Sequence, residues 1–130
     1  MPSYVVERVA AALNEHSKSV KGSSILVYGV AYKKNVNDVR ESPAFEVMEE
    51  LEKKGARVAF TDPLVPSVEL PSGEHKGVDP DFGAYDAVVV ITDHDGLDRE
   101  RLAREARIVI DTRDSLAGIK GLDPTRIFGL

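Results

Sequence analysis

The sequence contains no cysteine among its 130 residues. This absence excludes disulfide bonds, a thiol nucleophile and any metal site with cysteine ligands within these residues. Long apolar runs are also missing: the longest, residues 25–30 and 87–91, fall far short of the roughly 20 residues that a membrane-spanning helix needs. The N-terminus mixes acidic with basic side chains and has no apolar signal core. We therefore expect a cytoplasmic protein that makes no contact with a membrane.

The sequence also lacks an excess of positive charge. The chain has 17 Lys and Arg residues against 22 Asp and Glu residues, which gives a net charge of −5. A mildly acidic domain is a poor candidate for binding nucleic acid, so we expect no such partner. A local basic pocket for a small anion is still possible. With 42% hydrophobic residues and 30% charged residues, the chain can bury the core of one ordinary domain.

Short apolar runs alternate with helical patterns along the chain. Strands are predicted at residues 25–30, 57–61, 87–91 and 107–111, with a last short strand at 126–130. Helices are predicted at residues 3–18, 43–54 and 97–104, the second capped by Ser42 and opened by Pro43. The prolines and glycines of residues 64–81 predict a long irregular loop. This order indicates a Rossmann-like three-layer α/β sandwich with a mainly parallel sheet.

The first helix has no strand partner of its own. Its apolar residues Val5, Val9 and Ala12 recur at helical spacing, and a polar stretch at residues 19–24 follows. We interpret residues 1–22 as a connector helix with a hinge, and residues 23–130 as the domain proper. On this interpretation the apolar face of the connector helix is expected to be exposed.

Ligands of open α/β sheets bind at the carboxyl ends of the strands. The first such stretch, residues 31–42, contains Lys33, Lys34 and Arg40. Only Gly29 precedes it, so the three-glycine fingerprint of a dinucleotide site is absent. Cations that lead into a helix N-terminus suit a phosphate or carboxylate. A solvated basic loop explains the same residues equally well.

Two further strand ends carry acidic groups. Asp62 follows the second strand, where a Rossmann domain often holds its ribose-binding acid, although a simple turn is the favoured interpretation. Residues 92–95 contain three polar side chains next to His94, which could suggest a metal site. Helix capping near Gly96 or Asp98 is the better account, so His94 is interpreted as structural and no metal site is expected.

Arg113 follows the fourth strand. It can bind a ligand anion or pair with Asp111 or Asp114, and the spacing does not decide between these alternatives. The other two histidines, His16 and His75, have no serine or cysteine arranged beside them. The sequence therefore predicts no catalytic residue.

Three segments together resemble a known family. They are ILVYGVAYKKNVNDVRESPAFEVMEELEKKGARVAFTDPLVP at residues 25–66, YDAVVVITDHD at residues 85–95, and IVIDTR at residues 108–113. They resemble the C-terminal domain of nucleotide-sugar dehydrogenases, the UDP-glucose/GDP-mannose dehydrogenase family. The opening MPSYVVERV resembles the end of the long central helix of that family. The branch most similar in appearance comprises the UDP-N-acetyl-mannosamine and UDP-N-acetyl-glucosamine 6-dehydrogenases.

The resemblance implies a division of labour between domains. Family members have an NAD-binding domain, a central helical domain with the catalytic cysteine, and a UDP-sugar-binding domain. They oxidise the sugar C6 alcohol to a carboxylate with two NAD, through a thiohemiacetal, and dimerise through the central helix. By matched position, the resemblance implies that Tyr32, Lys33 and Arg113 bind the UDP-sugar. It implies that Arg40 reaches NAD held mainly by another domain.

The sequence departs from the whole family pattern in two respects. It has no G-x-G-x-x-G segment and no cysteine, so neither the NAD-binding domain nor the nucleophile lies within these residues. We expect a domain of a longer enzyme that is inactive alone, with the other domains of its parent chain and a UDP-sugar as partners. The parent is expected to be a homodimer or larger. The alternative is a stand-alone Rossmann-like nucleotide-binding or regulatory module.

Overall fold

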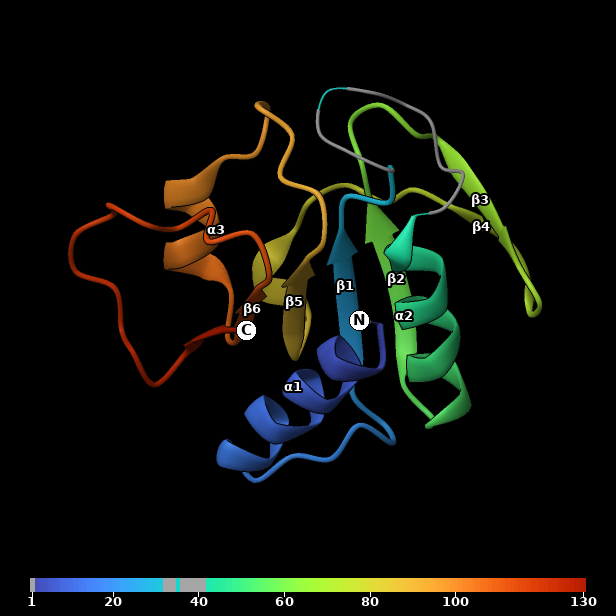
Figure 1. The fold of residues 1–130 in the computed structure, drawn as a ribbon, viewed down its shortest axis with the longest axis horizontal. Helices are drawn as coiled ribbons and strands as arrows, with labels where there is room; N and C mark the ends of the chain where they lie inside the picture. The colour runs from blue at the N-terminus through green and yellow to red at the C-terminus, as the bar shows by residue number, and fades with distance from the viewer. Residues whose placement is uncertain (1, 32–34, 36–41) are drawn as a thin grey trace.

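The computed structural model describes residues 2–31, 35 and 42–130 (Figure 1). In this part of the chain, five strands form a parallel sheet in the order β2-β1-β5-β6-β7. These strands are β1 (Ser24–Tyr28), β2 (Arg57–Thr61), β5 (Ala87–Val90), β6 (Val109–Asp111) and β7 (Ile127–Gly129). The helical elements are α1 (Pro2–Glu15), α2 (Pro43–Lys53), the 3-10 helix η1 (Phe82–Ala84) and α3 (Arg99–Glu105).

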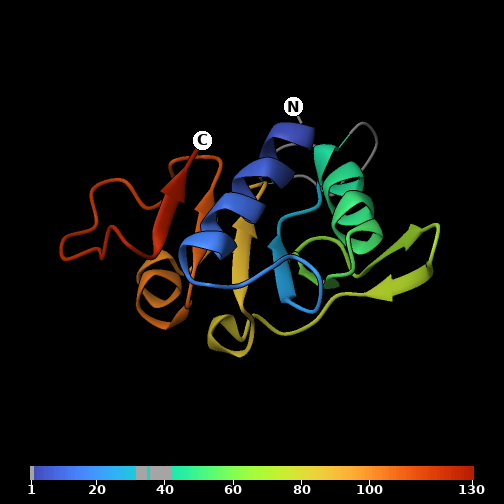
Figure 2. The ribbon, with the colours of Figure 1, turned by 90° about the horizontal axis from the view of Figure 1, so that it is seen from below.

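The sheet lies between two layers of helix (Figure 2). Helices α1 and α2 cover one face, and α3 and η1 lie on the other. Strand β1 serves both layers because successive side chains point to opposite faces. Ile25 and Val27 belong to the core beneath α1 and α2, whereas Leu26 and Tyr28 belong to the core beneath α3. The predicted three-layer α/β sandwich with a parallel sheet is therefore confirmed.

Local capping explains where two of the helices begin. The Ser42 hydroxyl accepts a hydrogen bond from the Ala44 N–H at 3.2 Å, and Pro43 occupies the first turn of α2. The Asp98 carboxylate accepts the Arg101 N–H at 3.1 Å and caps α3 in the same way. No helix in the described part of the chain has the length and apolar character that a bilayer crossing requires.

The prediction of a long irregular loop at residues 64–81 is wrong in part. This segment contains an antiparallel hairpin of β3 (Ser67–Leu70) and β4 (Gly73–Lys76), which extends to one side of the main sheet (Figure 1). Val68 and Leu70 alternate with polar residues and are buried, at 4% and 7% exposed. The pattern is only four residues long and ends at Pro71, which explains why the prolines and glycines around it dominate the prediction.

The apolar face of α1 is buried, so the expectation that it is exposed is wrong. Val5, Val9 and Ala12 are 5%, 0% and 0% exposed, and they belong to the core between α1, α2 and the sheet. The Arg8 Nε also donates to the Gly129 carbonyl of β7 at 2.9 Å. Helix α1 is thus part of the folded unit, because the sheet face beside α2 needs a second helix to cover it.

The strand order creates a switch point between β1 and β5. The chain runs from β1 outward to β2 and then returns to β5 on the other side of β1. The connection after β1 leads to α2 on one face, and the connection after β5 leads to α3 on the opposite face. Ligands of open α/β sheets bind at the carboxyl ends of strands at such a point.

Candidate functional site

Gly29, directly after β1, brings the ends of β1 and β5 into close contact. Its φ of +85° lies in the left-handed region, and a Cβ at this position would overlap with the backbone oxygen of Thr92. The Gly29 N–H donates to the Thr61 carbonyl at 2.9 Å. The single glycine of this loop therefore serves close packing of three strand ends.

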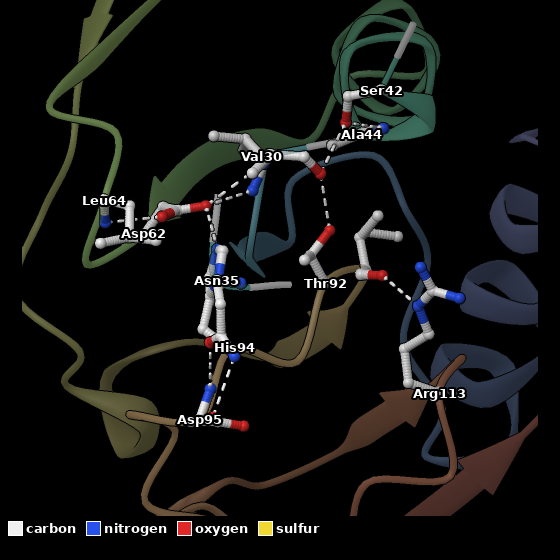
Figure 3. Close-up of polar contacts among 12 residues, drawn as sticks. Val30, Asn35, Ser42, Ala44, Asp62, Leu64, Thr92, His94, Asp95 and Arg113 are labelled. Atoms are coloured by element: carbon white, nitrogen blue, oxygen red, sulfur yellow. Dashed lines mark hydrogen bonds and ion pairs between the residues drawn. The ribbon is translucent and has the colours of Figure 1, made fainter. Parts of the chain in front are cut away.

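The Asp62 carboxylate follows β2, at one end of this edge, and accepts hydrogen bonds from four protein donors (Figure 3). Its Oδ2 accepts the N–H groups of Val30 and Ala31 at 2.8 and 3.2 Å, together with the His94 Nε2 at 3.0 Å. Its Oδ1 accepts the Leu64 N–H at 2.8 Å. The Leu64 bond agrees with the turn interpretation. Because four donors occupy the carboxylate, Asp62 is not available as a ribose-binding acid.

His94 is buried, at 1% exposed, and both of its ring nitrogens are hydrogen-bonded. Nδ1 accepts the backbone N–H of Asn35 at 2.8 Å, so the ring proton lies on Nε2 and is donated to Asp62. Both nitrogens of His94 are thus bonded to protein groups. The Asn35 side chain continues the contact by pairing with the Asp95 backbone N–H and carboxylate at 3.1 and 2.9 Å.

Tyr28, the last residue of β1, packs against His94. Its ring meets the His94 ring edge to face, with centroids 6.5 Å apart. Burial, reinforced by the negative charge of Asp62, raises the pKa of Tyr28 to about 12. The phenol therefore stays protonated at neutral pH and adds no charge to the edge.

The two residues directly after β5 join the site to β6. The Thr92 hydroxyl donates to the Ala31 carbonyl at 2.8 Å, and the Ile91 carbonyl accepts from the Arg113 Nε at 3.0 Å (Figure 3). Adjacent residues thus fix the loop after β1 on one side and Arg113 on the other. The carboxyl ends of β1, β5 and β6 form one connected edge.

The sequence leaves open whether Arg113 binds an anion or pairs with Asp111 or Asp114, and the structure narrows these alternatives. The Asp111 side chain accepts the backbone N–H groups of Arg113, Ser115 and Leu116, so it stabilises a turn. Within the described residues, no carboxylate forms an ion pair with the Arg113 guanidinium. The guanidinium Nε instead donates to the Ile91 carbonyl, and Arg113 is one of the residues that line a cavity of about 220 Å³. The other residues that line it are Val5, Pro43, Ile91, Thr112 and Leu130.

The chemistry of this cavity favours an anion. Pro43 is the first residue of α2, and the dipole of a helix N-terminus attracts negative charge. Arg113 adds a full positive charge with several N–H donors. The arrangement can bind and orient a charged group, but the described residues around it offer no nucleophile or general base.

Three predicted binding residues, Tyr32, Lys33 and Arg40, lie outside the described residues. Their proposed roles remain predictions. The Asp62–His94 pair was missed by sequence reasoning, although a signal exists. Both residues follow the ends of strands that flank β1, and parallel strand ends meet at one edge of a sheet.

The described residues do not fit a dinucleotide of their own. A Rossmann site needs glycines for close approach of the pyrophosphate and an acid for the ribose. Here Gly29 packs against Thr92, and the Asp62 carboxylate accepts hydrogen bonds from backbone N–H groups and from His94.

Comparison with known proteins identifies relatives of the whole fold. Residues 26–118 match the UDP-binding domain of the UDP-glucose/GDP-mannose dehydrogenase family. A UDP-N-acetyl-D-mannosamine dehydrogenase of Methanococcus maripaludis is 33% identical over 124 residues, covering 89% of this chain and 28% of the relative. A UDP-N-acetyl-D-glucosamine 6-dehydrogenase of Salmonella typhi is 32% identical over 101 residues, covering 72% of this chain and 23% of the relative.

A solved structure agrees with these sequence matches. The UDP-D-ManNAc dehydrogenase of Pyrococcus horikoshii superposes with a TM-score of 0.77 at 25% identity, covering 98% of this chain and 30% of that one. The predicted resemblance is confirmed. The chain spans less than a third of the length of each of these relatives.

Proposed function

The chain belongs to the UDP-glucose/GDP-mannose dehydrogenase family, and we propose that it is the UDP-sugar-binding domain of an NAD-dependent nucleotide-sugar 6-dehydrogenase. The parent enzyme would oxidise the C6 alcohol of the sugar to a carboxylate with two NAD. The names of the relatives favour a UDP-N-acetylhexosamine as the substrate class.

One observation carries the binding role: Arg113 lines a cavity beside the N-terminus of α2, at the carboxyl edge of the sheet. A diphosphate concentrates negative charge, which a guanidinium neutralises through paired N–H donors. In the proposal, Tyr32 and Lys33 bind the same UDP-sugar from the loop after β1. Lys33 would supply the second cation for the diphosphate.

The proposal gives these residues the task of holding the substrate, and it gives the oxidation to other parts of the parent enzyme. NAD would be bound mainly by another domain, with Arg40 reaching it from this one. The nucleophilic cysteine would also come from outside these residues, since they contain none. We further propose that residues 1–22 end the central connecting helix and that residues 23–130 form the binding domain. The parent would be a cytoplasmic homodimer or larger assembly.

Calorimetric titration of UDP into the chain tests the binding role. We expect measurable binding, weakened about tenfold in Lys33→Ala, because one charge-assisted contact contributes about 1.5 kcal/mol or more. Lys76→Ala, in the distant hairpin strand β4, is the matched control and should bind UDP unchanged. Absence of UDP binding, or equal loss in the two variants, would contradict the proposal.

An activity measurement tests the division of labour. The chain mixed with NAD and UDP-N-acetylhexosamines should produce no reduced cofactor, measured by absorbance. Turnover by these 130 residues alone would show that the oxidation does not need other domains.

A further inference from the structure

We propose that His94 is a positioning residue for nucleotide-sugar binding: oriented by Asp62, it fixes Asn35, two residues after Lys33. This inference rests on the proposed function of the domain. His94 itself cannot contact a substrate, because its side chain is 2% exposed and the Asp62 side chain beside it is 0% exposed. It acts through the backbone of Asn35.

The first step of the argument is the rigidity of Asp62. Its carboxylate is held by the N–H groups of Val30, Ala31 and Leu64, which belong to the connections after β1 and β2. The three backbone donors fix the orientation of the carboxylate, and its Oδ2 accepts a third hydrogen bond in a defined direction. The His94 Nε2–H donates to this Oδ2 at 3.0 Å. The ring is therefore locked in both tautomer and orientation.

The second step concerns Nδ1, the other nitrogen of the His94 ring, which faces Asn35. This nitrogen has a lone pair and accepts the backbone N–H of Asn35 at 2.8 Å. Because Nε2 carries the proton, Nδ1 is the acceptor in this tautomer. Two hydrogen bonds, from His94 to Asp62 and from the Asn35 N–H to His94, thus connect the buried sheet edge to Asn35, two positions after Lys33 in the sequence.

The third step is the unusual backbone of Asn35. Its φ of 64° is left-handed, a conformation that few residues other than glycine adopt and that asparagine tolerates with local hydrogen bonds from its side chain. Two further hydrogen bonds, between its side chain and Asp95, are exposed to solvent. Water competes with those two bonds, whereas the His94 acceptor is buried. The His94 bond therefore contributes most to fixing Asn35.

Two substitutions test separately the hydrogen bonds that the His94 ring makes to Asp62 and to Asn35. In His94→Gln, the side-chain amide reaches the Nε2 position and still donates to Asp62, but the acceptor for Asn35 is lost. In His94→Asn, the side-chain oxygen lies near the Nδ1 position, so the acceptor is kept and the donor to Asp62 is lost. Both variants leave a small gap in the buried edge, so both lose stability.

Calorimetric titration with UDP gives the decisive difference. We expect His94→Gln to bind UDP about threefold to tenfold more weakly than the original chain, the cost of one lost hydrogen bond. His94→Asn should stay within about twofold of the original affinity, whatever its stability. Ser24→Ala, which loses a side-chain contact to Asp86 at the opposite end of β1, should lose stability without losing affinity. Equal affinities in the two histidine variants would overturn the proposal.

Amide hydrogen exchange without UDP makes the inference independent of the proposed function. The Asn35 amide should exchange at least about threefold faster in His94→Gln than in the original chain, since its buried acceptor is gone. An unchanged exchange rate contradicts the anchor even if UDP binds. Failure of the original chain to bind UDP contradicts the proposed function and the role in binding, while the exchange rate still decides whether His94 fixes Asn35.

Discussion

Gly29 and Thr92 approach so closely that a side chain on the first would overlap with the backbone oxygen of the second. The contact joins the end of β1 to the first residues after β5, and these two strands are neighbours inside the sheet. It also sets the direction in which Val30 and Ala31 leave the sheet, toward the Asp62 carboxylate. One glycine therefore determines the geometry of the whole carboxyl edge.

Gly29→Ala is expected to lower the free energy of unfolding by about 3 kcal/mol or more, because left-handed strain and steric overlap add together. Gly118→Ala is the matched control, since Gly118 has a similar φ of +86° with no atom within 4 Å of an added Cβ. It should cost only the strain, about 1 to 2 kcal/mol. Urea denaturation measures both, and equal losses would show that the contact with Thr92 is unimportant.

The packing of α1 on the sheet gives a second prediction. Leu13 is 0% exposed, so Leu13→Ala should lower the free energy of unfolding by about 2 to 5 kcal/mol. Tyr4, on the same helix, is 46% exposed, and Tyr4→Ala should change stability by less than about 0.5 kcal/mol. Chemical denaturation followed by circular dichroism checks both values. If Leu13→Ala were harmless, α1 would be a separable connector after all.

Asp86 gives a prediction about pH at the amino end of the sheet. Its carboxylate accepts the Ser24 backbone N–H at 2.8 Å and pairs with the Lys18 Nζ at 3.2 Å. The Ser24 hydrogen bond, with help from Lys18, lowers the pKa of Asp86 despite partial burial. A lowered pKa stabilises the fold above the ordinary pKa of aspartate, and this stabilisation is lost as pH falls through the folded-state pKa.

Asp86→Asn should therefore be less stable than the original chain at pH 7, by about 1 to 3 kcal/mol. The difference between the two proteins should shrink as the pH falls from the ordinary pKa of aspartate, about 4, through the lower folded-state pKa of Asp86. Urea denaturation at pH 7 and at pH 3 measures this difference. A difference that stays constant or grows on acidification would contradict the assigned cause.

Local patterns in the sequence were sufficient to predict most of the fold. The apolar runs of β1 and β5 and the capping signal of Ser42 each depend on neighbouring residues, and each element formed close to its predicted place. The hairpin β3–β4 was missed because its alternation covers four residues per strand between proline and glycine signals. The burial of α1 was missed because it depends on which helix covers the second half of one sheet face, a tertiary property.

The candidate site shows the same limit. Arg113 could be singled out because a cation at a strand end is visible in the sequence, yet its cavity depends on α2 and on the C-terminal Leu130. His94 and Asp62 lie 32 positions apart, and their hydrogen bond follows only from the pairing of β1 with both β2 and β5. Residue type suggests chemistry, but the partners of a buried polar group follow from topology.

Arg113 tests the central claim that this carboxyl edge binds the diphosphate of a nucleotide sugar. Calorimetric titration with UDP should compare Arg113→Ala with Arg107→Ala, which removes an arginine before β6 at the opposite edge of the sheet. The account predicts that Arg113→Ala weakens UDP binding about tenfold or more, the loss of a charge-assisted contact, and that Arg107→Ala binds as the original chain does. UDP affinity that is unchanged in Arg113→Ala, or lowered equally in both variants, would contradict it.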